Sequence, residues 1–180
     1  TCYSLARFDY SEYTYDAANR IVNERYPDNQ QRSFSYDAAG NLRQITEPNG
    51  DQINYGYDAT NRIISRSIPG EANETFTYDA KGQLTSATNA NATVLLTYDP
   101  VARMTSERLN GKVTSYQYNT PGRTKVVSYP NGKLFTETFD LRGRLVSVGD
   151  NATQEVLTTY AFDEGNRKVG QSNLNGTSST

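Results

Sequence analysis

The sequence contains no histidine, and among its 180 residues there is one cysteine, Cys2. Without histidine the chain lacks the usual general base, the commonest metal ligand and every Ser–His or Cys–His pair. Its acidic residues are spread along the chain instead of forming pairs, and no phosphate-cradling glycine loop is present. One cysteine excludes an internal disulfide, and we interpret Cys2 as a buried or incidental thiol, with an intermolecular bridge as the alternative. The sequence therefore predicts no enzyme, no catalytic residue, no cofactor and no metal site.

Hydrophobic residues are scarce as well, at 35% of the chain, and the mean hydropathy is negative. No apolar run approaches the length that crosses a bilayer, so we expect no membrane insertion. The low apolar content also argues against one large globular core. Fourteen tyrosines and six phenylalanines are nevertheless too many aromatic residues for a disordered chain. Order must therefore come from many small contacts between neighbouring segments.

An excess of charge of one sign is missing too, because 18 basic residues face 20 acidic ones, for a formal net charge of −2. Such a chain has no overall attraction for a phosphate backbone, and we expect no nucleic-acid partner. The chain also lacks an initiator methionine and a charged-then-apolar leader. We interpret it as a piece of a longer protein. We expect residues 1–12 to form a partial repeat or leading strand, residues 13–170 about eight repeats, and residues 171–180 a soft tail.

An aromatic residue followed by Asp or Asn recurs eight times, at spacings of 20 to 23 residues. A fixed period of this length marks an array of tandem structural repeats. The positions of these pairs are Tyr15-Asp16, Tyr36-Asp37, Tyr57-Asp58, Tyr78-Asp79, Tyr98-Asp99, Tyr118-Asn119, Phe139-Asp140 and Phe162-Asp163.

The residue four positions after each aromatic is Gly or Asn in seven of the eight repeats. These two residue types tolerate a positive φ, so this position is predicted to be left-handed. The Asp or Asn after the aromatic can accept hydrogen bonds from backbone amides two residues on, as in an Asx-turn. Together they predict a type I turn with a bulge between antiparallel strands. The left-handed column comprises Asn19, Gly40, Asn61, Gly82, Ala102, Gly122, Gly143 and Asn166.

A second turn signal, such as Pro48-Asn49-Gly50, lies midway between successive aromatic pairs. Each repeat then reads as strand, turn, strand, turn, and no useful window has helical periodicity. The sequence therefore predicts an all-β fold of tandem hairpin repeats of about 21 residues, in one continuous, coiled antiparallel sheet.

The pattern Tyr15-Asp16-Ala17-Ala18-Asn19-Arg20-Ile21, with its counterpart from Phe139 to Leu145, resembles the Rhs or YD-repeat family over residues 13–170. That family includes bacterial polymorphic toxins, the C component of insecticidal toxin complexes, wall-associated proteins and the teneurins. The resemblance implies repeats that coil into a hollow shell, which in the bacterial toxins encloses a C-terminal toxin. It also implies a secreted or cell-surface protein. The Asp-Pro-rich segment near the self-cleavage site of the bacterial shells is missing, and we give Asp99-Pro100 no cleavage role.

The recurring Arg, Tyr and Asp positions could each bind a ligand, and each also has a structural interpretation. The column five residues after the aromatic could bind nucleic acid or polyanionic glycans, but we expect each Arg to pair with a turn Asp and to stack on a neighbouring Tyr. The Tyr column could contact sugars, but we expect it to supply packing. We interpret the Asp column as turn caps and not as a calcium ladder. The column five residues after the aromatic comprises Arg20, Asn41, Arg62, Gln83, Arg103, Arg123, Arg144 and Arg167.

The functional prediction is a non-catalytic structural segment that helps to build a β-shell around, or to present, another domain. The expected partners are the remainder of the parent chain and an enclosed C-terminal toxin, with self-association through edge strands. The alternative is a repeat module that binds carbohydrates or a cell surface.

Overall fold

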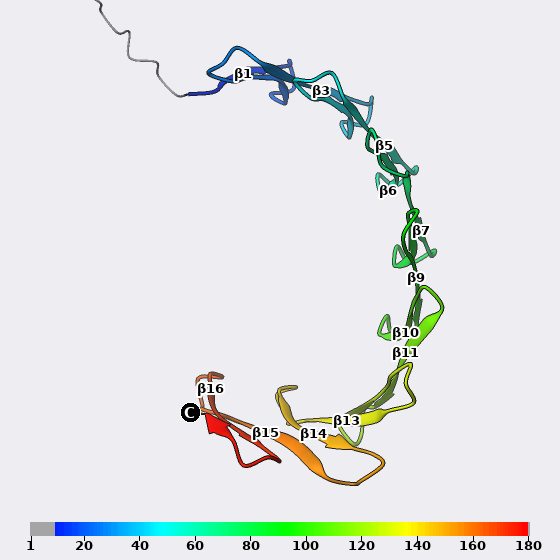
Figure 1. The fold of residues 1–180 in the computed structure, drawn as a ribbon, viewed down its shortest axis with the longest axis vertical. Coiled ribbons are helices and arrows are strands. Elements are labelled where there is room, and N and C mark those ends of the chain that lie inside the picture. The colour runs from blue at the N-terminus through cyan, green and yellow to red at the C-terminus, as the bar shows by residue number, and fades with distance from the viewer. Residues whose placement is uncertain (1–9, 180) are drawn as a thin grey trace, which may run out of the picture. The chain divides into compact units, whose positions relative to one another are not determined.

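The computed structural model describes residues 10–179, all of which form strands, turns and connecting segments without an α-helix (Figure 1). Cys2 and most of the expected leading segment, residues 1–12, lie outside the described residues. The strands are β1 (Glu12–Tyr15), β2 (Ile21–Arg25), β3 (Gln31–Tyr36), β4 (Leu42–Thr46), β5 (Gln52–Tyr57), β6 (Ile63–Ser67), β7 (Glu74–Tyr78), β8 (Leu84–Thr88), β9 (Thr93–Tyr98), β10 (Met104–Leu109), β11 (Lys112–Asn119), β12 (Thr124–Ser128), β13 (Leu134–Phe139), β14 (Leu145–Asp150), β15 (Val156–Phe162), β16 (Lys168–Asn173) and β17 (Ser178–Ser179).

The chain divides into two compact units, Thr1–Ala92 and Thr93–Thr180. In the first unit each strand from β1 to β8 pairs antiparallel with the next strand along the chain. The second unit has the same pattern from β9 to β17. The predicted all-β class of antiparallel hairpin repeats, two strands to a repeat, is therefore confirmed.

The two faces of each sheet carry different side chains, because successive residues of a strand point to opposite sides. On the aromatic face, defined by the aromatic columns and their cross-strand neighbours, Phe34 is paired with Ile45 and Ile45 with Ile53. The opposite, hydroxyl face carries Ser, Thr, Asn and Gln, as where Asn23 pairs with Ser33. This second face was not predicted from the sequence.

The predicted bulge and the predicted left-handed residue recur at the Tyr-Asp turns. The register shifts just before the aromatic residue, between Thr14 and Tyr15 for example, and the following turn places Asn19 at φ 60°. The Asn19 amide donates to the Asp16 carbonyl at 3.0 Å, and the Asp16 amide donates to the Arg20 carbonyl at 2.9 Å. The left-handed prediction is confirmed at seven of the eight positions.

At the sixth repeat the prediction is wrong. Gly122 has no positive φ, and Arg123 takes the left-handed conformation instead, at φ 50°. The reason is that β11 continues to Asn119, which pairs with Thr124 in an unshifted register. The turn then spans residues 120–123 and closes with the Arg123 amide on the Thr120 carbonyl, at 3.1 Å.

Burial is shallow throughout the described residues. Val127 is the one hydrophobic residue there that is fully buried, at 3% exposure, and it lies between its paired neighbours Tyr116 and Phe135. The other apolar side chains are half-buried or exposed, as expected for a chain ordered by contacts between neighbouring strands. Within residues 10–179 no helix is long and apolar enough to cross a membrane.

The segment expected to be a soft tail contains structure up to residue 179. It includes the end of β16, a turn closed by the Gly176 amide on the Asn173 carbonyl at 3.0 Å, and β17. Its softness remains a prediction.

Candidate functional site

The Asp of each regular repeat binds the turn that follows it. Asp16 Oδ1 accepts hydrogen bonds from the amides of Ala18 and Arg20, at 2.9 and 3.0 Å. Asp140 Oδ1 accepts from the amides of Arg142 and Arg144 in the same way, at 2.8 and 3.0 Å. These carboxylates therefore satisfy amides that the turn leaves without a strand partner.

The second oxygen of the same Asp binds the Arg four residues later. Arg20 Nε lies 2.7 Å from Asp16 Oδ2, and Arg144 Nε lies 2.6 Å from Asp140 Oδ2. In the second repeat Asn41 replaces the Arg and donates from Nδ2 to Asp37 Oδ2 at 3.0 Å. We call this arrangement the Asp–Arg clamp. It occurs in the pairs Asp16–Arg20, Asp58–Arg62, Asp99–Arg103, Asp140–Arg144 and Asp163–Arg167.

The clamp shifts the acidity of the turn carboxyls. The pKa of Asp16, Asp58 and Asp140 lies below the ordinary value, chiefly because each carboxylate accepts a hydrogen bond from the backbone amide of its Arg. The pKa of Asp37 is lowered as well, first by the hydrogen bond from the Asn41 side chain. These carboxyls are therefore held ionised in the folded chain, which suits a structural role and does not suit a general acid.

The Arg of four of the five clamps also contacts an aromatic ring of the next repeat. The Arg20 guanidinium carbon lies 4.3 Å from the centre of the Tyr36 ring, a cation–π contact. Equivalent contacts join Arg62 to Tyr78, Arg103 to Tyr118 and Arg144 to Phe162, at 4.6, 4.5 and 4.8 Å. The prediction that the Arg column pairs with the turn Asp and stacks on a neighbouring ring is confirmed for these clamps.

In several repeats the Tyr of the pair binds the preceding repeat through its hydroxyl group. Tyr36 Oη donates to the Ile21 carbonyl at 2.8 Å, and Tyr57 Oη donates to the Leu42 carbonyl at 2.9 Å. Tyr78 and Tyr118 make the same contact with the carbonyls of Ile63 and Met104, at 2.9 and 2.8 Å. This bond was not predicted from the sequence, although the spacing between the Tyr and the first residue of the preceding outward strand, 15 residues in three cases and 14 for Tyr118, could have suggested it.

The predicted repeat positions are not gathered into one site. Each aromatic ends a strand and each Asp begins the following turn, one pair to a repeat, except that Asn119 is the last residue of β11. Tyr15 is the most exposed aromatic residue of the column, at 54%, and the other seven are half-buried. Within residues 10–179 no three His, Cys, Asp or Glu side chains are grouped so that they could hold a metal ion.

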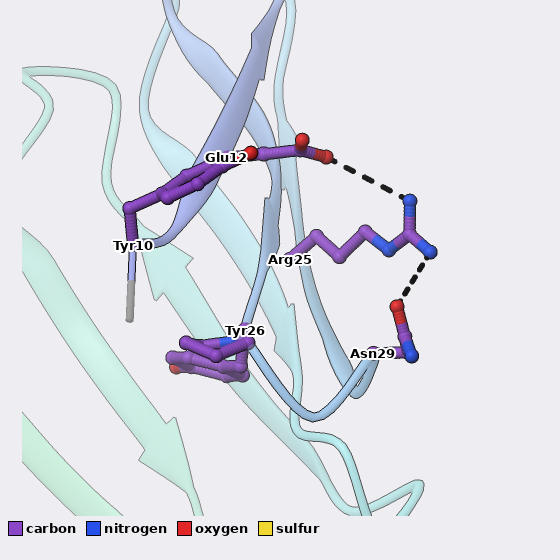
Figure 2. A pocket seen from close by; sticks show the side chains of 6 residues that line it. Tyr10, Glu12, Arg25, Tyr26 and Asn29 are labelled. Atoms are coloured by element: carbon purple, nitrogen blue, oxygen red, sulfur yellow. Dashed lines mark hydrogen bonds and ion pairs between the residues drawn. The ribbon is translucent and has the colours of Figure 1, made fainter. Parts of the chain in front are cut away.

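The surface between repeats is hollowed in places. One hollow of about 190 Å³ lies beside β1 and the turn after β2, and Figure 2 shows Arg25 there between Glu12 and Asn29. The Arg25 guanidinium lies 3.7 Å from the Glu12 carboxylate and donates to Asn29 Oδ1 at 2.7 Å. Another hollow, of about 380 Å³, lies beside Asp37 and the clamp residue Asp58. The carboxylates in both hollows, Glu12, Asp37 and Asp58, bind neighbouring side chains, so neither hollow presents an activated base.

Comparison with known protein families gives two matches. A family described as the RHS repeat matches residues 36–71, and a family described as the teneurin YD-shell matches residues 72–150. No curated protein matches the sequence.

Solved structures of Tc toxin proteins share the fold. A Tc holotoxin pore of Photorhabdus luminescens with a mutated TccC3 aligns at a TM-score of 0.64 and 16% identity, over 88% of this chain and 10% of that chain. TcdB2–TccC3 without its hypervariable C-terminal region aligns at 0.66 and 17% identity, over 88% and 10%. Another TcdB2–TccC3 structure aligns at 0.65 and 14% identity, over 92% and 12%. The chain thus spans about a tenth of the length of these toxin chains.

Proposed function

Residues 36–150 belong to the Rhs/YD-repeat family, and from this premise we propose that the chain is a non-catalytic segment of a β-shell wall. The segment encloses or presents another domain of its parent protein. The remainder of the parent chain is its first partner, and an enclosed C-terminal toxin is the second. The parent is a secreted or cell-surface protein.

The observation that carries this proposal is that the repeat-defining side chains bind neighbouring repeats. The Arg62 guanidinium stacks on Tyr78 of the following repeat and lies 3.4 Å from the Asp79 carbonyl. Tyr78 in turn donates its hydroxyl hydrogen to the Ile63 carbonyl of the repeat that contains Arg62. Two consecutive repeats are therefore tied in both directions, besides their backbone ladder. A wall needs such ties, because its strands have no second layer behind them to hold them in register.

A wall segment needs no chemistry of its own, and the bonding of the ionisable groups agrees with this. The clamp carboxylates and guanidinium groups bind one another, and the Tyr hydroxyls that would face a sugar donate to backbone carbonyls. At these regular repeats the Arg and Tyr columns are thus engaged within the sheet, which leaves the carbohydrate-binding alternative without an observation in its favour there. Self-association through the terminal strands is part of the proposal, because an open sheet has edges that invite pairing.

Protease accessibility in the longer protein tests the wall. The enclosed domain should resist trypsin at a concentration that cleaves the same domain expressed alone. Loosening the wall with the double variant Asp58→Ala/Asp140→Ala should raise the cleavage rate of that domain. Glu155→Ala is the matched control, because Glu155 is an exposed acid between β14 and β15, outside the clamps. Equal cleavage of the domain with and without this chain would contradict enclosure.

A further inference from the structure

The sixth repeat leaves one arginine of the column without its carboxylate. Asn119 stands where the regular repeats have Asp, and the shortened turn moves Arg123 out of the clamp position. Arg123 Nε donates to the Phe139 carbonyl at 3.3 Å, and no ion pair between the described residues includes Arg123. The other five arginines of the column each bind an Asp.

Arg123 borders a hollow of about 470 Å³ within the second unit, between the sixth and seventh Tyr-Asp turns. This volume lies within the range of small-molecule sites, about 300 to 1,000 Å³. The apolar part of its lining comes from Tyr118, Phe139 and Leu141, and Leu141 is 88% exposed. An exposed leucine beside two aromatic rings offers apolar surface that this chain leaves in contact with water.

The remaining charges in the lining are already compensated. Arg103 lies 2.7 Å from Asp99, Lys125 lies 2.7 Å from Glu137, and Asp140 is held by Arg144. Arg103 Nη1 also donates to Thr120 Oγ1 at 2.9 Å. The one charge in the hollow without a counter-charge is therefore that of the Arg123 guanidinium, a planar donor group that matches a carboxylate.

We propose that this hollow binds a small organic anion in which a carboxylate is joined to an aromatic or branched aliphatic group. The carboxylate pairs with the Arg123 guanidinium, and the apolar group lies against Phe139 and Leu141. Such a ligand supplies the counter-charge that Asp supplies in the regular repeats. It also covers the exposed apolar surface of Leu141 in the seventh turn.

The test is a titration of the ¹⁵N-labelled chain with 3-phenylpropionate, followed by amide chemical shifts. Saturable shifts should cluster at residues 119–125 and 139–143. Acetate has the charge without the ring, and 3-phenylpropanol has the ring without the charge. Each should bind at least about tenfold more weakly than 3-phenylpropionate, because acetate loses the apolar contact and 3-phenylpropanol loses the charged hydrogen bond.

Three variants separate this site from general adsorption. Arg123→Gln removes the charge and should weaken binding of 3-phenylpropionate roughly tenfold. Asn119→Asp returns an internal carboxylate beside Arg123 and should weaken it as well. Arg108→Gln should have no effect, because Arg108 is an exposed cation on β10 outside the hollow. Backbone amide shifts remote from the hollow show whether each variant keeps the fold.

Several results would overturn the proposal. Equal loss of binding in Arg108→Gln would show adsorption to cationic surface in general. Equal affinity for 3-phenylpropanol would show an apolar contact without the ion pair, and unchanged affinity in Arg123→Gln would exclude Arg123 as the anion partner. Shifts that never saturate, or that fall outside the two segments, would count against a site at this hollow.

Discussion

Ala102 and Gly143 occupy the same left-handed position of two equivalent turns, at φ 70° and 75°. The left-handed conformation costs a residue with a Cβ about 1–2 kcal/mol. At Gly143 a Cβ would meet no atom within 4 Å, so Gly143→Ala adds backbone strain and no steric clash. The reciprocal change, Ala102→Gly, removes that strain.

The net free-energy changes follow from two opposing contributions. Glycine loses more backbone entropy on folding than alanine, by roughly 0.5–1 kcal/mol. This difference offsets part of the strain that Ala102→Gly relieves and part of the strain that Gly143→Ala introduces. We therefore expect Ala102→Gly to stabilise its turn by about 0.5–1 kcal/mol, and Gly143→Ala to destabilise its turn by about the same amount. Gly143→Val should cost more than about 1 kcal/mol, because a β-branched residue is strained further at positive φ.

Native-state hydrogen exchange measures these changes locally, which matters because a repeat array does not unfold in one step. The reporter amides are those of Asp99 and Asp140, each bonded across its turn, to Arg103 and Arg144 at 2.9 and 3.0 Å. Ala59→Gly is the control, since Ala59 lies in an equivalent turn and is not left-handed; it should be neutral or slightly destabilising. Destabilisation by Ala102→Gly together with no effect of Gly143→Ala would refute the strain argument.

Three further predictions concern the Asp–Arg clamps, the tyrosine hydroxyl bonds and the order of unfolding along the repeats. The pKa values of Asp16 and Asp140 are lowered in the folded chain, so the folded chain binds fewer protons than the unfolded chain. The stability that these two carboxylates contribute is present above the ordinary Asp pKa of about 4 and is lost as the pH falls through their pKa values in the folded chain. Urea midpoints should therefore drop in acid below about pH 4, and a flat profile would contradict the clamp. Tyr57→Phe should cost about 1 kcal/mol in local exchange by removing the hydroxyl bond to the Leu42 carbonyl, and an unchanged rate would show that this bond adds nothing. Amides near Tyr57, Tyr78 and Tyr98 should be better protected than those of residues 172–180, whereas uniform protection would argue for a closed globular fold.

Much of the fold could be predicted from the sequence because its determinants are local. The Gly or Asn column fixes the turn by backbone sterics alone, and the spacing of Asp16 and Arg20 already places an acceptor and a donor on one turn. Those features require no knowledge of which strands lie side by side. The Arg–aromatic contact was predictable for the same reason, since it joins adjacent repeats.

The features that were missed depend on geometry across strands. The hydroxyl face becomes visible only when registers such as Asn23 with Ser33 are known. The irregular sixth turn was misjudged because Gly122 fits the left-handed column by residue type. The decisive difference was Asn119, which extends β11, pairs with Thr124 and accepts a hydrogen bond from the Gly122 amide in a shorter turn. The Arg123 guanidinium lacks a carboxylate partner because of that local change, whereas a comparable hollow also lies between the regular turns at Asp37 and Asp58.

The central claim, that these repeats are a wall, is tested most directly by a cryo-electron microscopy structure of the longer protein that contains this chain. The account predicts that the segment forms part of a continuous shell, with consecutive Asp–Arg clamps joining repeats and separate density for another part of the chain inside. A segment that projects from the surface as a free arm, with no enclosed density and with its aromatic face bound to an external glycan, would contradict it.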